Sequence, residues 1–273
     1  MTDELGRSVA LGAVPVRRVV CLAPSVTEIL FALGAGDMLV GRDKFSDAPE
    51  AALAVPIVGS DLEPSHERIL GLKPDVVFTA TTANRQETAE DLERYGVPVF
   101  VTKTMSLADL RGTIVHVGAI VGKTPEAAKL VASIDEGLAK IRAEREKLPR
   151  VKTLIVVWNE PLMVVGPGSY TTEILEAAGG ENVASDGSPG YPQYALERVL
   201  RAAPQVIVVG SHKDGGQVED RVTFWTRYRE IPAVRDGRVI PLDGDLLFRP
   251  GPRAVETARI VFDALYPKEK AKP

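Results

Sequence analysis

The chain has 273 residues, of which 45% are hydrophobic, and its formal net charge is −4. The length is sufficient for two small α/β lobes that each bury a core, and the scattered basic residues exclude the clustered positive charge of a nucleic-acid binder. No run of about 18 apolar residues is present, so we expect no membrane span. The single cysteine, Cys21, lies in an apolar run and is expected to be a buried, inert thiol.

The first half of the chain alternates apolar, β-branched runs with helical patterns. We predict Ser25 as the N-cap of the first helix, which ends at Gly34. Strands are predicted at 19–22, 75–79 and 97–101, and helices at 26–33 and 88–95. This βαβα order predicts a parallel sheet covered by helices.

A long helical pattern separates the two halves. It starts at Thr124-Pro125-Glu126, with Thr124 as N-cap and an acid near the positive end of the helix dipole, and is stopped by Pro149. One apolar stripe follows helical spacing, at Ala127, Leu130, Val131, Ile134, Leu138 and Ile141. About 24 residues at ~1.5 Å each give a rod of roughly 36 Å. We expect a rigid connector that limits opening and closing.

The second half repeats the alternation of the first. Strands are predicted at 153–157 and 206–209, and helices at 171–178 and 252–265. The fold class we predict is α/β, with two Rossmann-like, three-layer lobes whose mostly parallel sheets are joined by one long rigid helix. The expected limits are 1–122 and 150–273 for the lobes and 123–149 for the connecting helix.

Two sequence blocks recur in the two halves in the same order. The block 26–34 matches 171–179, and the block 65–77 matches 195–207. Internal repetition of this kind indicates two similar lobes, with the cleft between them as the default ligand site.

No catalytic or cofactor constellation emerges from the residues. The Gly34-Ala35-Gly36 segment lacks the third glycine of a dinucleotide fingerprint, and residues 166–169 lack the lysine of a phosphate loop. None of His66, His116 and His212 is paired at metal-ligand spacing, so we expect no metal site. We therefore interpret the chain as a binding protein, and keep an enzyme acting on a tetrapyrrole or a metal chelate as the alternative of another class.

Several aromatic residues stand in loops beside proline and glycine, where they suit a rigid apolar wall. We predict Tyr191 and Phe248 as ligand contacts, whereas Trp225 is expected in the core. The other loop or strand-end aromatics are Phe45, Trp158 and Tyr194.

The chain resembles the class III periplasmic substrate-binding proteins of ABC importers, the helical-backbone family that takes up vitamin B12, haem and ferric siderophores. The resemblance runs from about Asp3 to Leu265. It is carried by five blocks in order, which are 18–41, 73–75, 203–205, 231–239 and 249–253.

The resemblance implies roles for individual residues. Glu67 and Glu197 match the glutamates that dock onto a dimeric permease, each on one lobe. Tyr191 matches a cleft aromatic of the cobalamin-binding branch, and Asp245 and Arg249 match an acid and an arginine that contact the polar edge of the corrinoid. Asp61 stands where that branch has an aromatic.

We therefore expect an extracytoplasmic receptor, periplasmic or on the cell surface, that hands a corrinoid to an ABC importer permease with its ATPase. Its signal or lipid anchor is expected to be absent from this sequence, and the protein to be a monomer without an intrinsic cofactor. The predicted ligand contacts are Phe45, Asp61, Trp158, Tyr191, Tyr194, Asp245, Phe248 and Arg249.

Haem or a ferric siderophore is the alternative ligand of the same class. A haem receptor would offer an axial ligand, for which Tyr191 or Tyr194 could serve. A siderophore receptor would show more arginines than Arg249 and Arg253.

Overall fold

Buried runs of valine and isoleucine form the strands of two separate sheets. The computed structural model describes residues 1–12, 15–81, 84–211 and 218–267. The chain divides into unit 1, Met1–Ile134, and unit 2, Asp135–Pro273. The boundary falls inside α5 (Thr124–Arg145), a continuous helix of 22 residues.

Unit 1 contains a four-stranded parallel sheet with the order β2-β1-β3-β4. Its strands are β1 (Val19–Cys21), β2 (Leu39–Arg42), β3 (Val76–Ala80) and β4 (Val99–Thr102). Three of them were predicted from the sequence, and β2 was not. Nearly every strand residue is buried, as expected for a parallel sheet covered on both faces.

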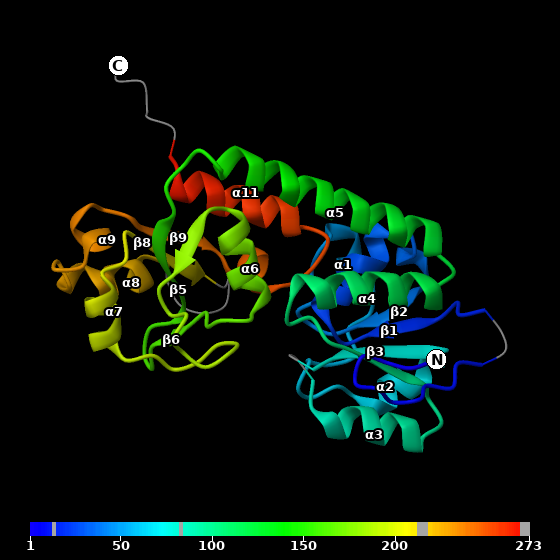
Figure 1. Cartoon of the computed structure of the whole chain (residues 1–273). Coiled ribbons are helices and arrows are strands. Elements are labelled where there is room, and N and C mark those ends of the chain that lie inside the picture. The colour runs from blue at the N-terminus through cyan, green and yellow to red at the C-terminus, as the bar shows by residue number, and fades with distance from the viewer. Residues whose placement is uncertain (13–14, 82–83, 212–217, 268–273) are drawn as a thin grey trace. The chain divides into compact units, whose positions relative to one another are not determined.

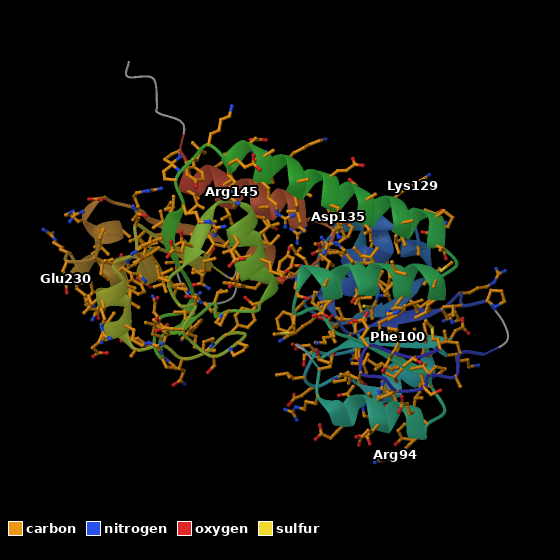
Figure 2. The ribbon with its side chains drawn as sticks, in the orientation of Figure 1. Arg94, Phe100, Lys129, Asp135, Arg145 and Glu230 are labelled. Atoms are coloured by element: carbon orange, nitrogen blue, oxygen red, sulfur yellow. The ribbon has the colours of Figure 1, made fainter. Side chains whose placement is uncertain are left out.

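Four helices cover this sheet, with α1 and α4 on one face and α2 and α3 on the other (Figure 1). They are α1 (Pro24–Ala32), α2 (His66–Gly71), α3 (Gln86–Arg94) and α4 (Leu107–Ile120). Two short 3-10 helices are η1 (Gly36–Met38) and η2 (Glu50–Ala54). Phe100 of β4 packs edge to face against Phe78 of β3, with ring centroids 5.9 Å apart (Figure 2). Arg94 of α3 is exposed, and its guanidinium lies 2.7 Å from the Asp91 carboxylate.

The predicted N-cap of α1 is wrong. Ala23 is the extended N-cap residue (φ −134°, ψ 113°), and the helix begins at Pro24, so Ser25 lies inside its first turn. Proline fits this position because its φ is already helical and its missing N–H would have no partner in the helix.

Unit 2 contains a five-stranded sheet with the order β6-β5-β8-β9, in which β7 also pairs with β5. Only β6 is antiparallel among these pairs. The strands are β5 (Val151–Trp158), β6 (Met163–Val164), β7 (Gly180–Asn182), β8 (Val206–Ser211) and β9 (Val239–Asp243).

The helices of unit 2 also form two layers, with α7, α8 and α9 on one side of the sheet and α6 and α11 on the other (Figure 1). They are α6 (Tyr170–Ala177), α7 (Leu196–Ala202), α8 (Val218–Thr223), α9 (Pro232–Arg235), α10 (Gly244–Phe248) and α11 (Ala254–Leu265), with the 3-10 helix η3 (Phe224–Arg227). The core between sheet and helices contains Trp225, fully buried as predicted. The mostly parallel α/β architecture expected from the sequence is confirmed in each unit.

The predicted apolar stripe of α5 is largely buried. Ala127, Ile134, Leu138 and Ile141 are each at most 3% exposed. In unit 2, the α5 residue Gly137 lies against Val255 of α11, and Glu144 pairs with Arg259 at 2.6 Å. No helix within the described residues is both long and apolar enough to cross a membrane.

The sequence repeat is also a repeat of backbone geometry. In each unit the first strand forms parallel pairs with two others, β1 with β2 and β3, and β5 with β7 and β8. Lys73 (φ 47°) and Ala203 (φ 50°) are the only non-glycine residues with positive φ in the described part of the chain. Each follows the equivalent helix, α2 or α7, and precedes a proline, where a left-handed residue ends the helix.

Two glycines of α4 should respond oppositely to the same substitution. A methyl group at Gly112 meets no atom within 4 Å, whereas one at Gly118 would lie 2.5 Å from the Cβ atom of Ala127. We expect Gly112→Ala to stabilise the protein by about 0.5–1 kcal/mol through helix propensity. Gly118→Ala should destabilise it by about 1–3 kcal/mol through overpacking. Urea denaturation measures both, and effects of the same sign would contradict this packing of α4.

Candidate functional site

The carboxyl ends of the parallel strands are the places where an α/β sheet offers a ligand site. In unit 2 these ends are Trp158 of β5, Asn182 of β7, Ser211 of β8 and Asp243 of β9. The loops that follow carry most of the residues predicted to contact the ligand. Unit 2 is therefore described first.

An aromatic pair lies at this edge. Tyr191 and Phe248 meet edge to face, with ring centroids 5.9 Å apart. Phe248 ends α10 and packs on the backbone of β8, because a Cβ atom at Gly210 would lie 2.3 Å from its ring. Burial raises the pKa of the Tyr191 phenol, which is hydrogen-bonded to Thr171. Two rings predicted from separate loops are thus brought together.

An ion pair stands on the same short helix. Arg249 contacts Asp245 at 3.2 Å, one turn earlier, and the two side chains are 10% and 26% exposed. Asp243 caps the helix by accepting the Asp245 N–H at 2.8 Å. This helix therefore carries an acceptor and a donor of opposite charge.

Trp158 is exposed at the end of β5, with 43% of its surface accessible. Its indole N–H donates to the Glu160 carbonyl oxygen at 2.9 Å. The guanidinium of Arg221 lies 4.4 Å from the ring centroid. Arg221 is 7% exposed and its pKa is lowered by burial. Arg221 was not predicted from the sequence, and it lies on a short helix outside both repeated blocks.

Tyr194 lies in the core of unit 2 and not on the ligand wall predicted for it. Its side chain is 6% exposed, its hydroxyl donates to Asp186 at 2.7 Å, and Arg198 lies over its ring at 4.4 Å. Burial and the bond to Asp186 raise its pKa to about 12. Proximity to Tyr191 in the sequence was misleading, because the intervening Gln193 pairs with Met163 and turns the next ring inward.

In unit 1, Phe45 is 38% exposed and follows β2. The ammonium of Lys44 lies 4.5 Å from its ring centroid. The buried Asp43 fixes this turn by accepting the Phe45 N–H at 2.7 Å and the Ser46 hydroxyl. An internal polar anchor thus holds an aromatic side chain at the carboxyl edge of the sheet.

Asp61 lies in the loop between β2 and α2, and its backbone is tied to the same edge. The side-chain amide of Asn84 donates to the carbonyl oxygens of Asp61 (2.7 Å) and Leu22 (3.1 Å). Its amide oxygen accepts the Ala80 N–H at 2.8 Å. Asn84 therefore joins the segments that follow β1, β2 and β3, a role without a signal in the sequence.

Glu67 and Glu197 occupy equivalent places in the first turns of α2 and α7, and both are exposed. Within the described residues neither carboxylate has an ion-pair partner. The arginine after each is engaged elsewhere, because Arg68 donates to the Ile57 carbonyl oxygen at 3.3 Å and Arg198 pairs with Asp186.

The cysteine and the described histidines do not form a reactive or metal-binding centre. Cys21 is fully buried and its pKa is raised to about 12, chiefly by burial, as expected for an inert thiol. His116 bonds to Glu4 at 3.1 Å, and His212 lies outside the described residues. Among the residues that the structure describes, no group of three or more His, Cys, Asp and Glu could hold a metal ion.

Comparison with known proteins gives consistent matches over nearly the whole chain. The family model described as "Periplasmic binding protein" matches residues 19–246. A vitamin B12-binding protein of Vibrio vulnificus is 31% identical over 248 residues, which are 91% of this chain and 89% of that protein.

Two solved structures are also similar. The periplasmic vitamin B12 binding protein BtuF of Vibrio cholerae has a TM-score of 0.78 and 27% identity, with 92% of this chain and 97% of that chain covered. The periplasmic heme-binding protein RhuT from Roseiflexus sp. RS-1 has a TM-score of 0.81 and 30% identity, with 92% and 98% covered.

The raised pKa of Tyr194 predicts a pH dependence of stability. Because its pKa rises from 10.0 to about 12, the folded state holds the phenol proton more tightly than the unfolded state does. The resulting stabilisation is complete below pH 10 and is lost as the pH rises towards 12. In Tyr194→Phe, the free energy of unfolding should fall less steeply above pH 10 than in the wild type. Urea denaturation across this range measures the slopes, and equal slopes would refute the assignment.

Proposed function

The chain belongs to the periplasmic binding protein family, whose members are binding proteins and not enzymes, and on that premise we propose that it captures a corrinoid for delivery to an ABC importer. The observation that carries this proposal is the Tyr191–Phe248 pair beside the Asp245–Arg249 ion pair. Curated relatives named for vitamin B12, at up to 31% identity, support the same ligand class.

A corrinoid combines a broad apolar face with an edge of uncharged amide groups. Aromatic rings held edge to face suit the apolar part. The ion pair suits the amides, because Asp245 can accept from an amide N–H and Arg249 can donate to an amide oxygen. A neutral pair gives no net attraction to the carboxylates of haem. In unit 1, Phe45 and Asp61 are the further contacts that we propose.

Haem is the second candidate, favoured by the 30% identity to a heme-binding protein of solved structure. Ferric haem would need an axial ligand, and a tyrosine serves in that role as its phenolate. The pKa of Tyr191 is raised by burial, which disfavours the phenolate. Tyr194 lies in the core with a pKa of about 12. The corrinoid remains the proposal, because the Asp245–Arg249 pair suits amide groups and a relative named for vitamin B12 matches 91% of this chain.

The partner that we propose is the permease dimer of the importer with its ATPase. Glu67 and Glu197 support this because two exposed acids at equivalent positions of the repeat can meet a partner with two-fold symmetry. With their neighbouring arginines engaged elsewhere, both carboxylates are available to external cations. We propose that the receptor acts as a monomer outside the cytoplasm.

The ligand proposal predicts a ranking of affinities. Cyanocobalamin should bind more tightly than haem or a ferric hydroxamate siderophore in calorimetric titrations. Tyr191→Ala and Phe248→Ala should each weaken cyanocobalamin binding by about 10- to 100-fold, as truncation of a buried aromatic contact does. Tyr95→Ala, an exposed aromatic at the C-cap of α3, is the control and should leave affinity unchanged. Tight haem binding without cyanocobalamin binding would overturn the choice of ligand.

The partner proposal predicts a separation of capture from delivery. Glu67→Arg and Glu197→Arg should each reduce stimulation of the importer's ATPase, and together abolish it, because like charges would then meet at the interface. Affinity for cyanocobalamin should not change. Glu87→Arg and Glu256→Arg, which alter exposed first-turn acids of α3 and α11, are the matched controls. Full stimulation by the double variant would exclude these glutamates from docking.

A further inference from the structure

We propose that Arg221 is a positioning residue that holds the Trp158 indole as a one-sided stacking platform for the apolar face of the ligand. This inference rests on the proposed function and extends it to a residue outside the predicted site. Trp158 is the group that touches the ligand, and Arg221 acts through it.

The indole is fixed at two points. Its N–H donates to the Glu160 carbonyl oxygen at 2.9 Å, which sets the direction of one ring edge. The Arg221 guanidinium lies 4.4 Å from the ring centroid and occupies one face. The ring nevertheless keeps 43% of its surface exposed, at the end of the strand that is central to the unit 2 sheet. The ring face opposite Arg221 is the one that we propose for the ligand.

Arg221 is itself held firmly by the ends of two strands. Its Nη1 donates to the carbonyl oxygens of Gly210 (2.6 Å) and Val157 (3.4 Å), and it is 7% exposed. The Asn159 side-chain amide donates to the Arg221 carbonyl oxygen at 3.0 Å, so the backbone of α8 is fixed as well. A guanidinium suits this place because its planar fork can bond two carbonyls while its face stacks on a ring.

Gly210 connects the platform to the aromatic pair. Its carbonyl oxygen accepts from Arg221, and its missing side chain leaves room for the Phe248 ring. Gly210 of β8 therefore contacts the Phe248 ring directly and holds Trp158 through Arg221. A large ligand with a flat apolar face, such as a corrinoid, could contact both.

A double-mutant cycle tests the inference with cyanocobalamin as the probe. We expect Trp158→Ala and Arg221→Met each to weaken binding by about 5- to 30-fold, the range of aromatic stacking and cation–π energies. In the Trp158→Ala background, Arg221→Met should cause no further loss, because a residue that acts only through the ring has nothing left to position. Additive losses would mean that Arg221 contacts the ligand directly, which would overturn the positioning role.

Tryptophan fluorescence reports on the ring without any ligand. The chain has two tryptophans, and Trp225 is fully buried, so acrylamide quenching reports mainly on Trp158. Arg221→Met should raise the quenching constant by about twofold, since the thioether lacks the hydrogen bonds that hold the guanidinium against the ring, and should lower the anisotropy. Arg221→Lys, which keeps the charge and a donor, should restore part of both. Quenching equal to that of the wild type in Arg221→Met would overturn the proposal.

The controls separate this inference from the proposed function. Arg227 lies 4.7 Å over the Phe224 ring in the same unit, so Arg227→Met removes a similar interaction and should change neither affinity nor quenching. Unchanged affinity in Trp158→Ala, with tight binding by the wild type, would overturn the platform alone. Absence of cyanocobalamin binding by the wild type would overturn the proposed function together with the stacking role.

Discussion

Parallel pairing of neighbouring strands is the constraint on which the proposed site depends. Because β5, β8 and β9 run in the same direction, their carboxyl ends meet at one edge, although Trp158 and Asp243 are 85 positions apart in the sequence. This alignment of the strands positions Trp158, the hydrogen bond from Arg221 to Gly210, and the Asp243 cap of α10. A shift of one residue in the register would turn each side chain to the other face of the sheet.

Both units contain parallel strand pairs, and the two copies of the repeat also show where the units differ. Each unit ends an equivalent short helix with a left-handed residue before proline, at Lys73 and at Ala203, and each has a glutamate in the first turn of that helix. The loops at the carboxyl edge have diverged. In unit 1 the buried Asp43 fixes Phe45. Unit 2 instead has the Asp245–Arg249 ion pair, the Tyr191–Phe248 ring pair and the Arg221–Trp158 contact. The shared backbone therefore supports unlike ligand surfaces.

Hydrophobic period and β-branched content identified five strands and five helices, which are β1, β3, β4, β5, β8, α1, α3, α5, α6 and α11. The 14-residue helix α4 and the strands β6, β7 and β9 were not predicted. The short β2 was missed, since Leu39–Arg42 includes a glycine and an arginine. Ser25 was wrongly predicted as the N-cap because the helix already begins one residue earlier, at Pro24.

Among the site residues, Tyr191, Phe248, Asp245 and Arg249 could be proposed from loop composition and family resemblance. Tyr194 was misassigned because loop membership does not reveal which way a ring turns. Arg221 and Asn84 act through backbone carbonyls far away in the sequence, and no local pattern encodes such a partner.

The Asp245–Arg249 ion pair has a consequence for how the receptor would respond to its surroundings. Mutual neutralisation leaves a dipole at the edge of unit 2, and a dipole facing uncharged amides is little affected by dissolved ions. Glu67 and Glu197, in contrast, would attract a cationic partner across solvent, an attraction that falls with ionic strength. In the proposed function, the salinity of the medium would thus alter the handover to the importer while leaving capture almost constant.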